Sequence, residues 1–490
     1  MGIIIRQSIK SSAIAYLGVL IGYINVLWLY TYFLDTEQVG LFRLIQSSAY
    51  LLATFGQFGL AQSFIRFYPE HKSQKGYLPV ALIGGTIGFL LLCGFSLLFQ
   101  KQIAGYFAQE SPLFVEFFQL TLLISYLIIL YQLLEAYSRS LLNIVVPTIL
   151  KDVGLRLSTM LLLIIYGVSY ISFTTLIHSL LLVYGLAVIG LLVHFASNKQ
   201  LSISLDFSFL KKGQWKRILN YGLFSLIGAG GTQIILQIDS VMISGSLGLD
   251  ETGIYTIAFF IGVVIEMPKR AITQLSAPLL ARSFNKNDMQ AVEKLYKQTS
   301  INQMIIGALL LIGIWSNINN IYSFIPNNEA YLGGLSVVLF IGLGKLSDMI
   351  FGTNGEIIVM SRYFRFNVIA VAFLAVITVL LNLWLIPQYG IEGAAIASFV
   401  AMLSFNLVKY VFVWVKFGIQ PFGISTLKML LIIGIVLLIN FWLPVLNSHL
   451  VDLILRSAII SFSLLSLVVI LKISEEVNQL FYTAFKKLKR

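Results

Sequence analysis

Ionisable side chains inside long apolar stretches are the first residues of this sequence that could do chemistry. A charge at the centre of a membrane helix costs roughly 2.5–3.5 kcal/mol, so it must be paired, reach the surface or face a wet cavity. Glu266, Lys269 and Arg270 place two cations against one anion, and Lys151 has no acid three or four positions away. Excess positive charge at this depth suits an anionic group. The alternative stays open that these cations lie at the cytoplasmic ends of their helices.

Two arginines flank the apolar stretch 41–67. Arg43 follows a turn that we place on the external side, where cations are rare, and it has no acid nearby in sequence. We predict that it lies at the outer mouth of a cavity, with simple extension to the membrane surface as the alternative. Arg66 precedes Pro69 at the predicted cytoplasmic end and is a weaker candidate for the same cavity.

Two carboxylates are candidates for ion coupling. Asp239 lies near the middle of its stretch, where it could bind Na⁺ or carry a proton, or act as a hydrogen-bonded structural group. Asp348 is three residues from Lys345, so the two either neutralise each other on one helix or contact a ligand. Asn25 and Gln57 are further polar candidates for the cavity wall.

The elements that must position these residues are membrane helices. The chain is 58% hydrophobic and 11% charged, which is too apolar for a soluble protein of this length. A bilayer crossing takes about 20 helical residues, and the sequence contains about fourteen stretches of that kind. The stretches are 10–32, 41–67, 78–99, 115–137, 144–166, 172–196, 218–246, 253–275, 301–323, 331–352, 366–386, 391–415, 426–446 and 450–472. They lack the alternation of a membrane β-barrel, so we predict an all-α integral membrane protein.

Two short patterns occur twice. Residues 34–42 and 249–255 are both acidic turns before an apolar stretch, and Tyr-Gly joins two apolar stretches at 166–167 and at 389–390. Repeats of this kind predict a transporter built from two related lobes. We predict six-helix lobes at 1–196 and 218–415, a cytoplasmic linker at 197–217, an appended two-helix hairpin at 416–472 and a basic tail at 473–490.

The net charge of +12 has a topological explanation. Alternate loops carry nearly all of the Lys and Arg residues, whereas the opposite loops carry essentially Lys101. The positive-inside rule then places both termini in the cytoplasm and argues against nucleic acid as a partner. The basic tail is expected to contact anionic lipids. We expect no cleaved signal peptide, because the first stretch has membrane length, and the single Cys93 excludes an internal disulfide.

Six short motifs carry a resemblance to a known family. They lie at residues 36–42, 58–60, 237–243, 248–255, 277–279 and 389–397, the last containing Gly-Ile-Glu-Gly-Ala-Ala-Ile-Ala. They resemble the polysaccharide flippases of the multidrug, oligosaccharidyl-lipid and polysaccharide (MOP) exporter superfamily, often called Wzx or polysaccharide biosynthesis proteins.

The resemblance implies a MATE-like fold and the transport of a polyprenyl-diphosphate-linked oligosaccharide from the inner to the outer leaflet of a bacterial inner membrane. It implies alternating access, no catalysis and no cofactor, with Na⁺ or protons as coupling ions. It also implies membrane lipids and other polysaccharide assembly proteins as partners. Spans one, two, seven and eight line the cavity in such proteins, which supports Arg43, Arg66, Lys269 and Arg270.

Two other functions stay open. A drug or cation exporter of the same superfamily would favour an acidic cavity, whereas cations outnumber anions at membrane depth here. A polysaccharide polymerase or glycosyltransferase would need a large external loop or an acidic catalytic motif, and the sequence has neither. Its four histidines show no metal-binding spacing. The sequence does not identify the glycan or the coupling ion.

Overall fold

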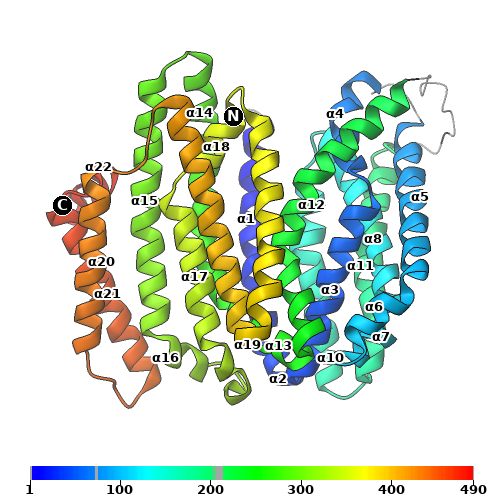
Figure 1. The fold of residues 1–490 in the computed structure, drawn as a ribbon, viewed down its shortest axis with the longest axis horizontal. Coiled ribbons are helices and arrows are strands. Elements are labelled where there is room, and N and C mark those ends of the chain that lie inside the picture. Colours follow the sequence, from blue (N-terminus) through cyan, green and yellow to red (C-terminus); the bar gives the residue numbers. More distant parts are fainter. Residues whose placement is uncertain (1–2, 72–75, 202–203, 205–212, 489–490) are drawn as a thin grey trace. The chain divides into compact units, whose positions relative to one another are not determined.

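The computed structural model describes residues 3–71, 76–201, 204 and 213–488, and these residues form helices and no strand (Figure 1). The predicted all-α membrane class is confirmed. The helices of the first half are α1 (Ile3–Ile24), η1 (Asn25–Tyr30), α2 (Thr31–Phe33), α3 (Thr36–Gly56), α4 (Leu60–His71), α5 (Tyr77–Leu98), α6 (Gln100–Phe107), α7 (Pro112–Glu116), α8 (Phe118–Ser140), α9 (Val145–Thr148), η2 (Ile149–Gly154), α10 (Leu155–Gly167), α11 (Phe173–Ser197) and α12 (Gln214–Leu247). Those that follow are α13 (Leu249–Val263), η3 (Val264–Glu266), α14 (Met267–Asn285), α15 (Met289–Ser316), α16 (Ile318–Ser323), η4 (Asn328–Gly334), α17 (Leu335–Ile350), α18 (Asn354–Met360), α19 (Phe364–Phe417), α20 (Ile424–Trp442), α21 (His449–Ile470) and α22 (Glu475–Leu488).

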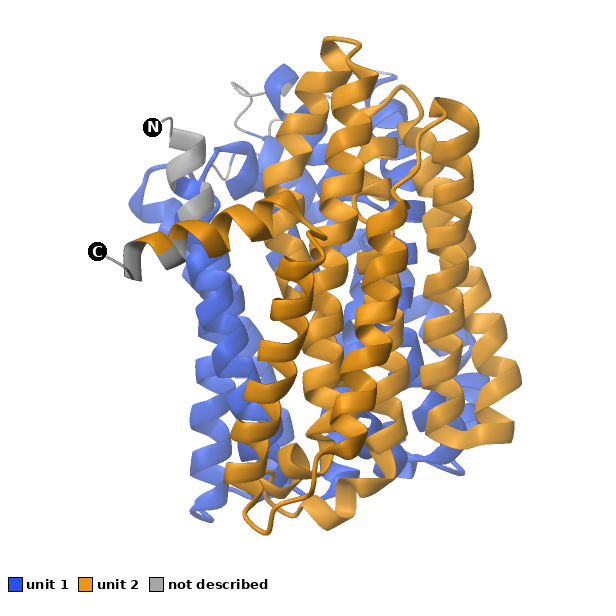
Figure 2. Ribbon diagram, turned by 90° about the vertical axis from the view of Figure 1, so that its left-hand side faces the viewer, with its two compact units in different colours: residues 1–256 blue, residues 257–490 orange. Residues whose placement is uncertain are grey.

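The chain forms two compact units, unit 1 at 1–256 and unit 2 at 257–490 (Figure 2). Unit 1 contains α12, which the sequence places at the start of the second lobe. The two units are defined by contacts in space, and their boundary differs from the boundary that the sequence repeat predicts. The lobes at 1–196 and 218–415, the hairpin and the tail therefore stay predictions. Parts of the predicted linker, 202–203 and 205–212, and of the tail, 489–490, lie outside the described residues.

Ten helices among the described residues are long and apolar enough to cross a membrane, so the predicted count of about fourteen is not confirmed. Three predicted spans are each divided into shorter helical segments, and none of these segments is among the ten helices that are long and apolar enough. The stretch 41–67 breaks between α3 and α4, where Phe58 and Gly59 have positive φ angles of 51° and 68°. The stretch 144–166 contains the π-helix η2, and the stretch 253–275 contains the 3₁₀ turn η3.

The two predicted spans 366–386 and 391–415 both fall within the 54 residues of α19. The backbone leaves the helical region at Gly390, with φ 60° and ψ −140°, so α19 is two helices that meet at this residue. Only glycine adopts this conformation without strain. Just beyond it, a Cβ atom at Gly393 would overlap the carbonyl of Leu385, so the close turn needs glycine at 393 as well.

Within unit 1, the interrupted helix α3–α4 packs between α8 and α12. The Asp35 carboxylate caps the start of α3 by accepting a hydrogen bond from the Gln38 backbone N–H. Near the other end, Gly59 approaches the backbone of Gly222 so closely that a side chain at Gly59 would overlap the Gly222 carbonyl. The contact of Gly59 with Gly222 holds the break against α12.

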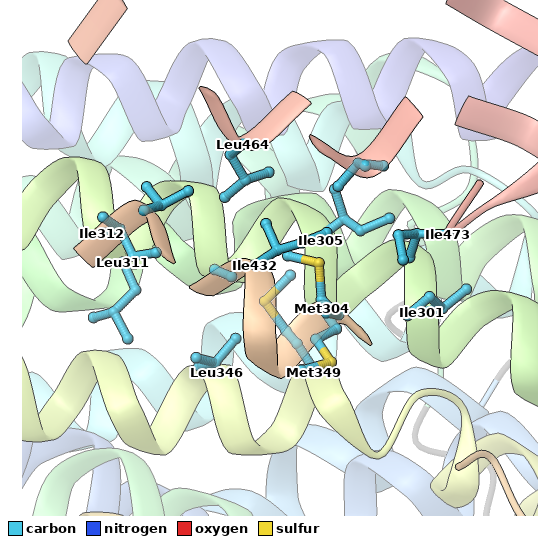
Figure 3. Packing of buried hydrophobic residues seen from close by; sticks show 14 of the residues in the cluster. Ile301, Met304, Ile305, Leu311, Ile312, Leu346, Met349, Ile432, Leu464 and Ile473 are labelled. Atoms are coloured by element: carbon cyan, nitrogen blue, oxygen red, sulfur yellow. The ribbon is translucent and has the colours of Figure 1, made fainter. Parts of the chain in front are cut away.

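Within unit 2, α15, α17, α20 and α21 share one apolar core (Figure 3). Met304 of α15 and Met349 of α17 lie in its centre, and Ile432 of α20 and Leu464 of α21 pack onto them. The two helices predicted as an appended hairpin are thus packed against unit 2 by buried side chains. Because lipid tails are as apolar as these side chains, van der Waals packing and not transfer from water holds the helices together.

Candidate functional site

A polar cavity of about 290 Å³ lies at the break between α3 and α4 in unit 1. Four elements enclose it: the α3–α4 segment, α8, η2 and α12. Its lining residues are Thr54, Gln57, Ala61, Gln62, Ile65, Gln132, Glu135, Ala136, Arg139, Lys151, Ala229, Thr232 and Gln233. Of the residues predicted from sequence, Gln57 and Lys151 both line this cavity.

The charged group of the cavity is one carboxylate between two cations. Glu135 accepts from Arg139 at 2.5 Å, one turn along α8, and its second oxygen lies 3.7 Å from the Lys151 amine of η2. Lys151 therefore has an acidic partner, which another helix, α8, supplies. Glu135 is 13% exposed, whereas Arg139 and Lys151 are 52% and 39% exposed. The group keeps one excess positive charge, and its cations are the more accessible members.

Amide side chains form the other part of the wall. The Gln57 Nε2 group donates to Gln132 Oε1 at 2.6 Å. The Oε1 atoms of Gln57 and Gln233 are buried and accept no hydrogen bond from the described part of the protein. Gln57 is 7% exposed. Buried amide oxygens without a partner are uncommon in native proteins.

Arg43 and Asp239 belong to a second polar group in unit 1. The Arg43 guanidinium donates to Ser240 Oγ at 3.0 Å and to the Leu236 carbonyl at 3.3 Å, both on α12. Asp239 is 5% exposed and accepts a hydrogen bond from the Tyr255 hydroxyl at 2.8 Å. Asp239 also interacts electrostatically with Arg43. Arg43 thus joins α3 to α12 beside a buried carboxylate, and the roles predicted for both residues stay predictions.

Asn25 and Arg66 lie outside the cavity. Asn25 begins the π-helix η1, is buried, and donates to the Arg156 carbonyl at 2.8 Å. Arg66 is exposed, with its guanidinium 4.6 Å from the centre of the Tyr221 ring. The first is a contact between η1 and α10, and the second is a cation–π contact on the surface of unit 1.

The predicted cations of span eight lie in unit 2. Lys269 forms an ion pair with Asp348, and Glu266 forms one with Lys345 at 2.6 Å. Lys345 and Asp348, which could neutralise each other along one helix, each form a direct ion pair with the segment η3–α14 instead, and Lys345 also interacts electrostatically with Asp348. Helix α17 adds one cation and one anion to Glu266, Lys269 and Arg270, so the group keeps its excess of one positive charge. Arg270 is exposed, and no carboxylate lies within 4.0 Å of it in the described part of the chain.

The sequence analysis did not predict several residues of these polar groups. Lys409 of α19 is 5% exposed, lies 3.9 Å from the Phe405 ring centre and interacts electrostatically with Asp348. Gln132, Glu135 and Arg139 recur every three or four residues on α8, and this spacing was the available signal for a polar helix face.

In the part of the chain that the structure describes, no three His, Cys, Asp or Glu side chains gather as a metal site.

Comparison with known proteins places this geometry in a family. A sequence model described as "Polysaccharide biosynthesis protein" matches residues 5–284, more than half of the chain. The chain belongs to this family. A relative of the polysaccharide biosynthesis protein family, the "Probable low-salt glycan biosynthesis flippase Agl15" of Haloferax volcanii, is 21% identical over 412 residues, or 82% of this chain and 83% of its own.

Solved structures agree on the fold of this family member. The lipid II flippase MurJ in an inward closed conformation has a TM-score of 0.71 at 15% identity, covering 95% of this chain and 98% of its own. An inward-facing multidrug resistance MATE family transporter of the MOP superfamily has a TM-score of 0.65 at 14% identity, covering 85% and 98%. A MOP superfamily transporter from Pyrococcus furiosus has a TM-score of 0.56 at 13% identity, covering 85% and 95%. The chain is a multi-pass membrane protein with the MurJ and MATE fold.

Proposed function

We propose that this protein is a flippase that moves polyprenyl-diphosphate-linked oligosaccharide repeat units from the inner to the outer leaflet by alternating access, for cell-surface polysaccharide assembly. The observation that carries the proposal is the unit-1 cavity, in which Arg139 and Lys151 outnumber Glu135. A relative named as a glycan biosynthesis flippase and a fold shared with a lipid II flippase support it.

The charge arrangement suits reversible binding of a diphosphate. Glu135 holds both cations in the empty cavity and so limits the cost of placing them at membrane depth. An entering diphosphate, with its greater charge, would replace the carboxylate as their partner, and Arg139 could bind it through two parallel hydrogen bonds. When the diphosphate leaves, Glu135 would take the cations back. Transport requires such moderate binding, because the same site must also release its substrate.

The setting and the coupling are part of the proposal. We place the protein in the bacterial inner membrane with both termini in the cytoplasm, acting beside other polysaccharide assembly proteins and in contact with membrane lipids. Na⁺ or protons would drive the cycle through Asp239 and Asp348, without catalysis or a cofactor. Arg43, Arg66, Lys269, Arg270 and Asn25 are retained as candidate contacts along the substrate path.

Export of a drug or cation is the second candidate function, because a multidrug MATE transporter shares the fold. The excess positive charge of the unit-1 cavity disfavours a cationic cargo. A polymerase or glycosyltransferase is the enzymatic alternative, and the relatives reported above are named as flippases and transporters.

The test is deletion of the gene followed by analysis of the lipid pool. We expect complete lipid-linked repeat units to accumulate on the cytoplasmic face, with restoration by the native chain and poor restoration by Lys151→Met. Lys101→Met is the control, because Lys101 is exposed on α6 and lies outside the cavity. Accumulation of unpolymerised units outside the membrane would instead support a polymerase, and an unchanged lipid pool would contradict the flippase.

A further inference from the structure

The wall of the unit-1 cavity has hydrogen-bonding capacity that the described protein does not use. Gln57 is almost completely buried, yet its Oε1 atom accepts no hydrogen bond, and the same holds for the buried Oε1 atom of Gln233. The two glutamines reach the cavity from different elements, the α3–α4 break and α12. A buried amide oxygen without a partner loses its hydration, which costs about 1–3 kcal/mol if nothing replaces it.

Two threonines add further acceptors to this wall. The Thr54 hydroxyl donates to the Tyr50 carbonyl at 2.9 Å, and the Thr232 hydroxyl donates to the Gly228 carbonyl at 2.9 Å. Each threonine has therefore used its only donor on its own helix and keeps acceptor lone pairs. Together with the two amide oxygens, they present acceptors from both sides of the cavity.

We propose that this wall binds the hydroxyl groups of the sugar joined directly to the diphosphate, and that it favours a neutral sugar there. Hydroxyl groups supply donors to Gln57, Gln233, Thr54 and Thr232, while the phosphates contact Lys151 and Arg139 in the same cavity. An ionised sugar carboxylate would replace a hydroxyl donor by acceptors and would place a second anion beside Glu135. This inference rests on the proposed function and adds to it the chemical class of the first sugar.

The test compares ligands that differ only in the group joined to the outer phosphate. The full chain in nanodiscs is titrated with geranyl methyl diphosphate, with glucosyl geranyl diphosphate and with glucuronyl geranyl diphosphate, so that the diphosphate carries the same charge in all three. The wild type should bind the glucosyl compound at least tenfold more tightly than geranyl methyl diphosphate, and the glucuronyl compound more weakly than the glucosyl one. Gln57→Leu and Gln233→Leu should each reduce the glucosyl preference about fivefold, as expected for one lost neutral hydrogen bond.

Control variants separate this inference from the flippase proposal. Gln119→Leu removes an exposed glutamine of α8 and should leave all three affinities unchanged. Unchanged binding of geranyl methyl diphosphate by Gln57→Leu shows that the cavity is intact, and Gln57→Asn provides a milder change at the same place. Lys151→Met should weaken all three ligands.

The outcomes that contradict the two proposals differ. If wild type binds none of the three compounds, the diphosphate site fails and the sugar wall fails with it. If the compounds bind and Lys151→Met weakens them, but Gln57→Leu and Gln233→Leu leave the glucosyl preference unchanged, the flippase proposal stands and the sugar wall is overturned. Equal affinity of wild type for the glucosyl and glucuronyl compounds would overturn the preference for a neutral sugar.

Discussion

Gly40 packs directly on the backbone of Leu249, so closely that a Cβ atom at Gly40 would overlap the Leu249 carbonyl and lie 3.1 Å from the Gly253 nitrogen. The contact is reciprocal, because a Cβ atom at Gly253 would overlap the Thr36 carbonyl. Gly40 and Gly253 occupy equivalent places in the repeated acidic turn of the sequence. The two copies of that turn therefore face each other within unit 1, and each requires glycine because of the backbone of the other.

Alanine at either glycine should destabilise the protein. The new methyl group would meet backbone atoms, which cannot rotate away, and overpacking of this kind costs about 1–3 kcal/mol. We expect Gly40→Ala and Gly253→Ala to lower the melting temperature of the purified protein in detergent. Gly105→Ala is the matched control, because Gly105 lies in α6 with no atom within 4 Å of the added Cβ. A melting temperature that falls equally in all three variants would contradict the packing argument.

A covalent bond between the two turns should stop transport. The Thr36 hydroxyl donates to the Asp250 carboxylate, and these residues lie in the predicted first and second lobes, 1–196 and 218–415. Alternating access by lobe movement requires this contact to break in one state. In a Cys93→Ser background, Thr36→Cys with Asp250→Cys should block transport in reconstituted vesicles when oxidised and recover it when reduced. Each single cysteine variant is the control, and full transport by the oxidised pair would argue against movement at this contact.

Removing Glu135 should tighten diphosphate binding. Glu135→Gln leaves Arg139 and Lys151 without their carboxylate, so the excess charge of the group rises from one to two. We expect the affinity for geranyl diphosphate to rise about tenfold, equivalent to about 1.4 kcal/mol, with a steeper dependence on salt. Release should slow, and transport should fall despite the tighter binding. Titration at two ionic strengths measures the first effect, and weaker binding by Glu135→Gln would refute the proposed exchange of partners.

Variants of the ion pair between Lys269 and Asp348 can distinguish a structural role of Lys269 from a role in substrate binding. Both side chains are largely buried, at 15% and 11% exposed. Lys269→Met should destabilise unit 2 by up to about 3–5 kcal/mol, because it removes the direct partner of a buried carboxylate and leaves it only the electrostatic interaction with Lys409 and Lys345. Lys269→Met with Asp348→Leu should recover part of that loss, because Lys409 then loses Asp348. Thermal unfolding measures both variants. If the double variant is stable and still transports, Lys269 is not required by the substrate.

The fold was more predictable from sequence than the site. Apolar stretches of membrane length identify the helices, because no other element can satisfy the backbone in lipid. Interruptions at Phe58, in η2 and at η3 were not predicted, since they depend on local packing and not on hydropathy. For the site, charge at membrane depth singled out Lys151, which lines the unit-1 cavity, but its partner Glu135 is on another helix. Spacing along one helix paired Lys345 with Asp348, and a closer helix supplied other partners for both.

Asp239→Asn tests whether the buried carboxylate of α12 couples transport to an ion. Asparagine keeps an oxygen that can accept the hydrogen bond of the Tyr255 hydroxyl, so we expect the local packing around Asp239 to survive. The substitution removes the negative charge that interacts with Arg43 and could attract Na⁺ or a proton. Transport in vesicles should therefore lose its dependence on the Na⁺ or pH gradient.

Tyr255→Phe is the matched control, because it removes the hydrogen bond and leaves the carboxylate in place. It should retain the gradient dependence of the wild type at a modest cost in stability, about 1 kcal/mol for the hydrogen bond. If Asp239→Asn and the wild type respond equally to every Na⁺ and pH gradient, Asp239 is a structural partner of Tyr255 and Arg43. The coupling ion would then act through another group, and Asp348 in unit 2 would become the residue to test.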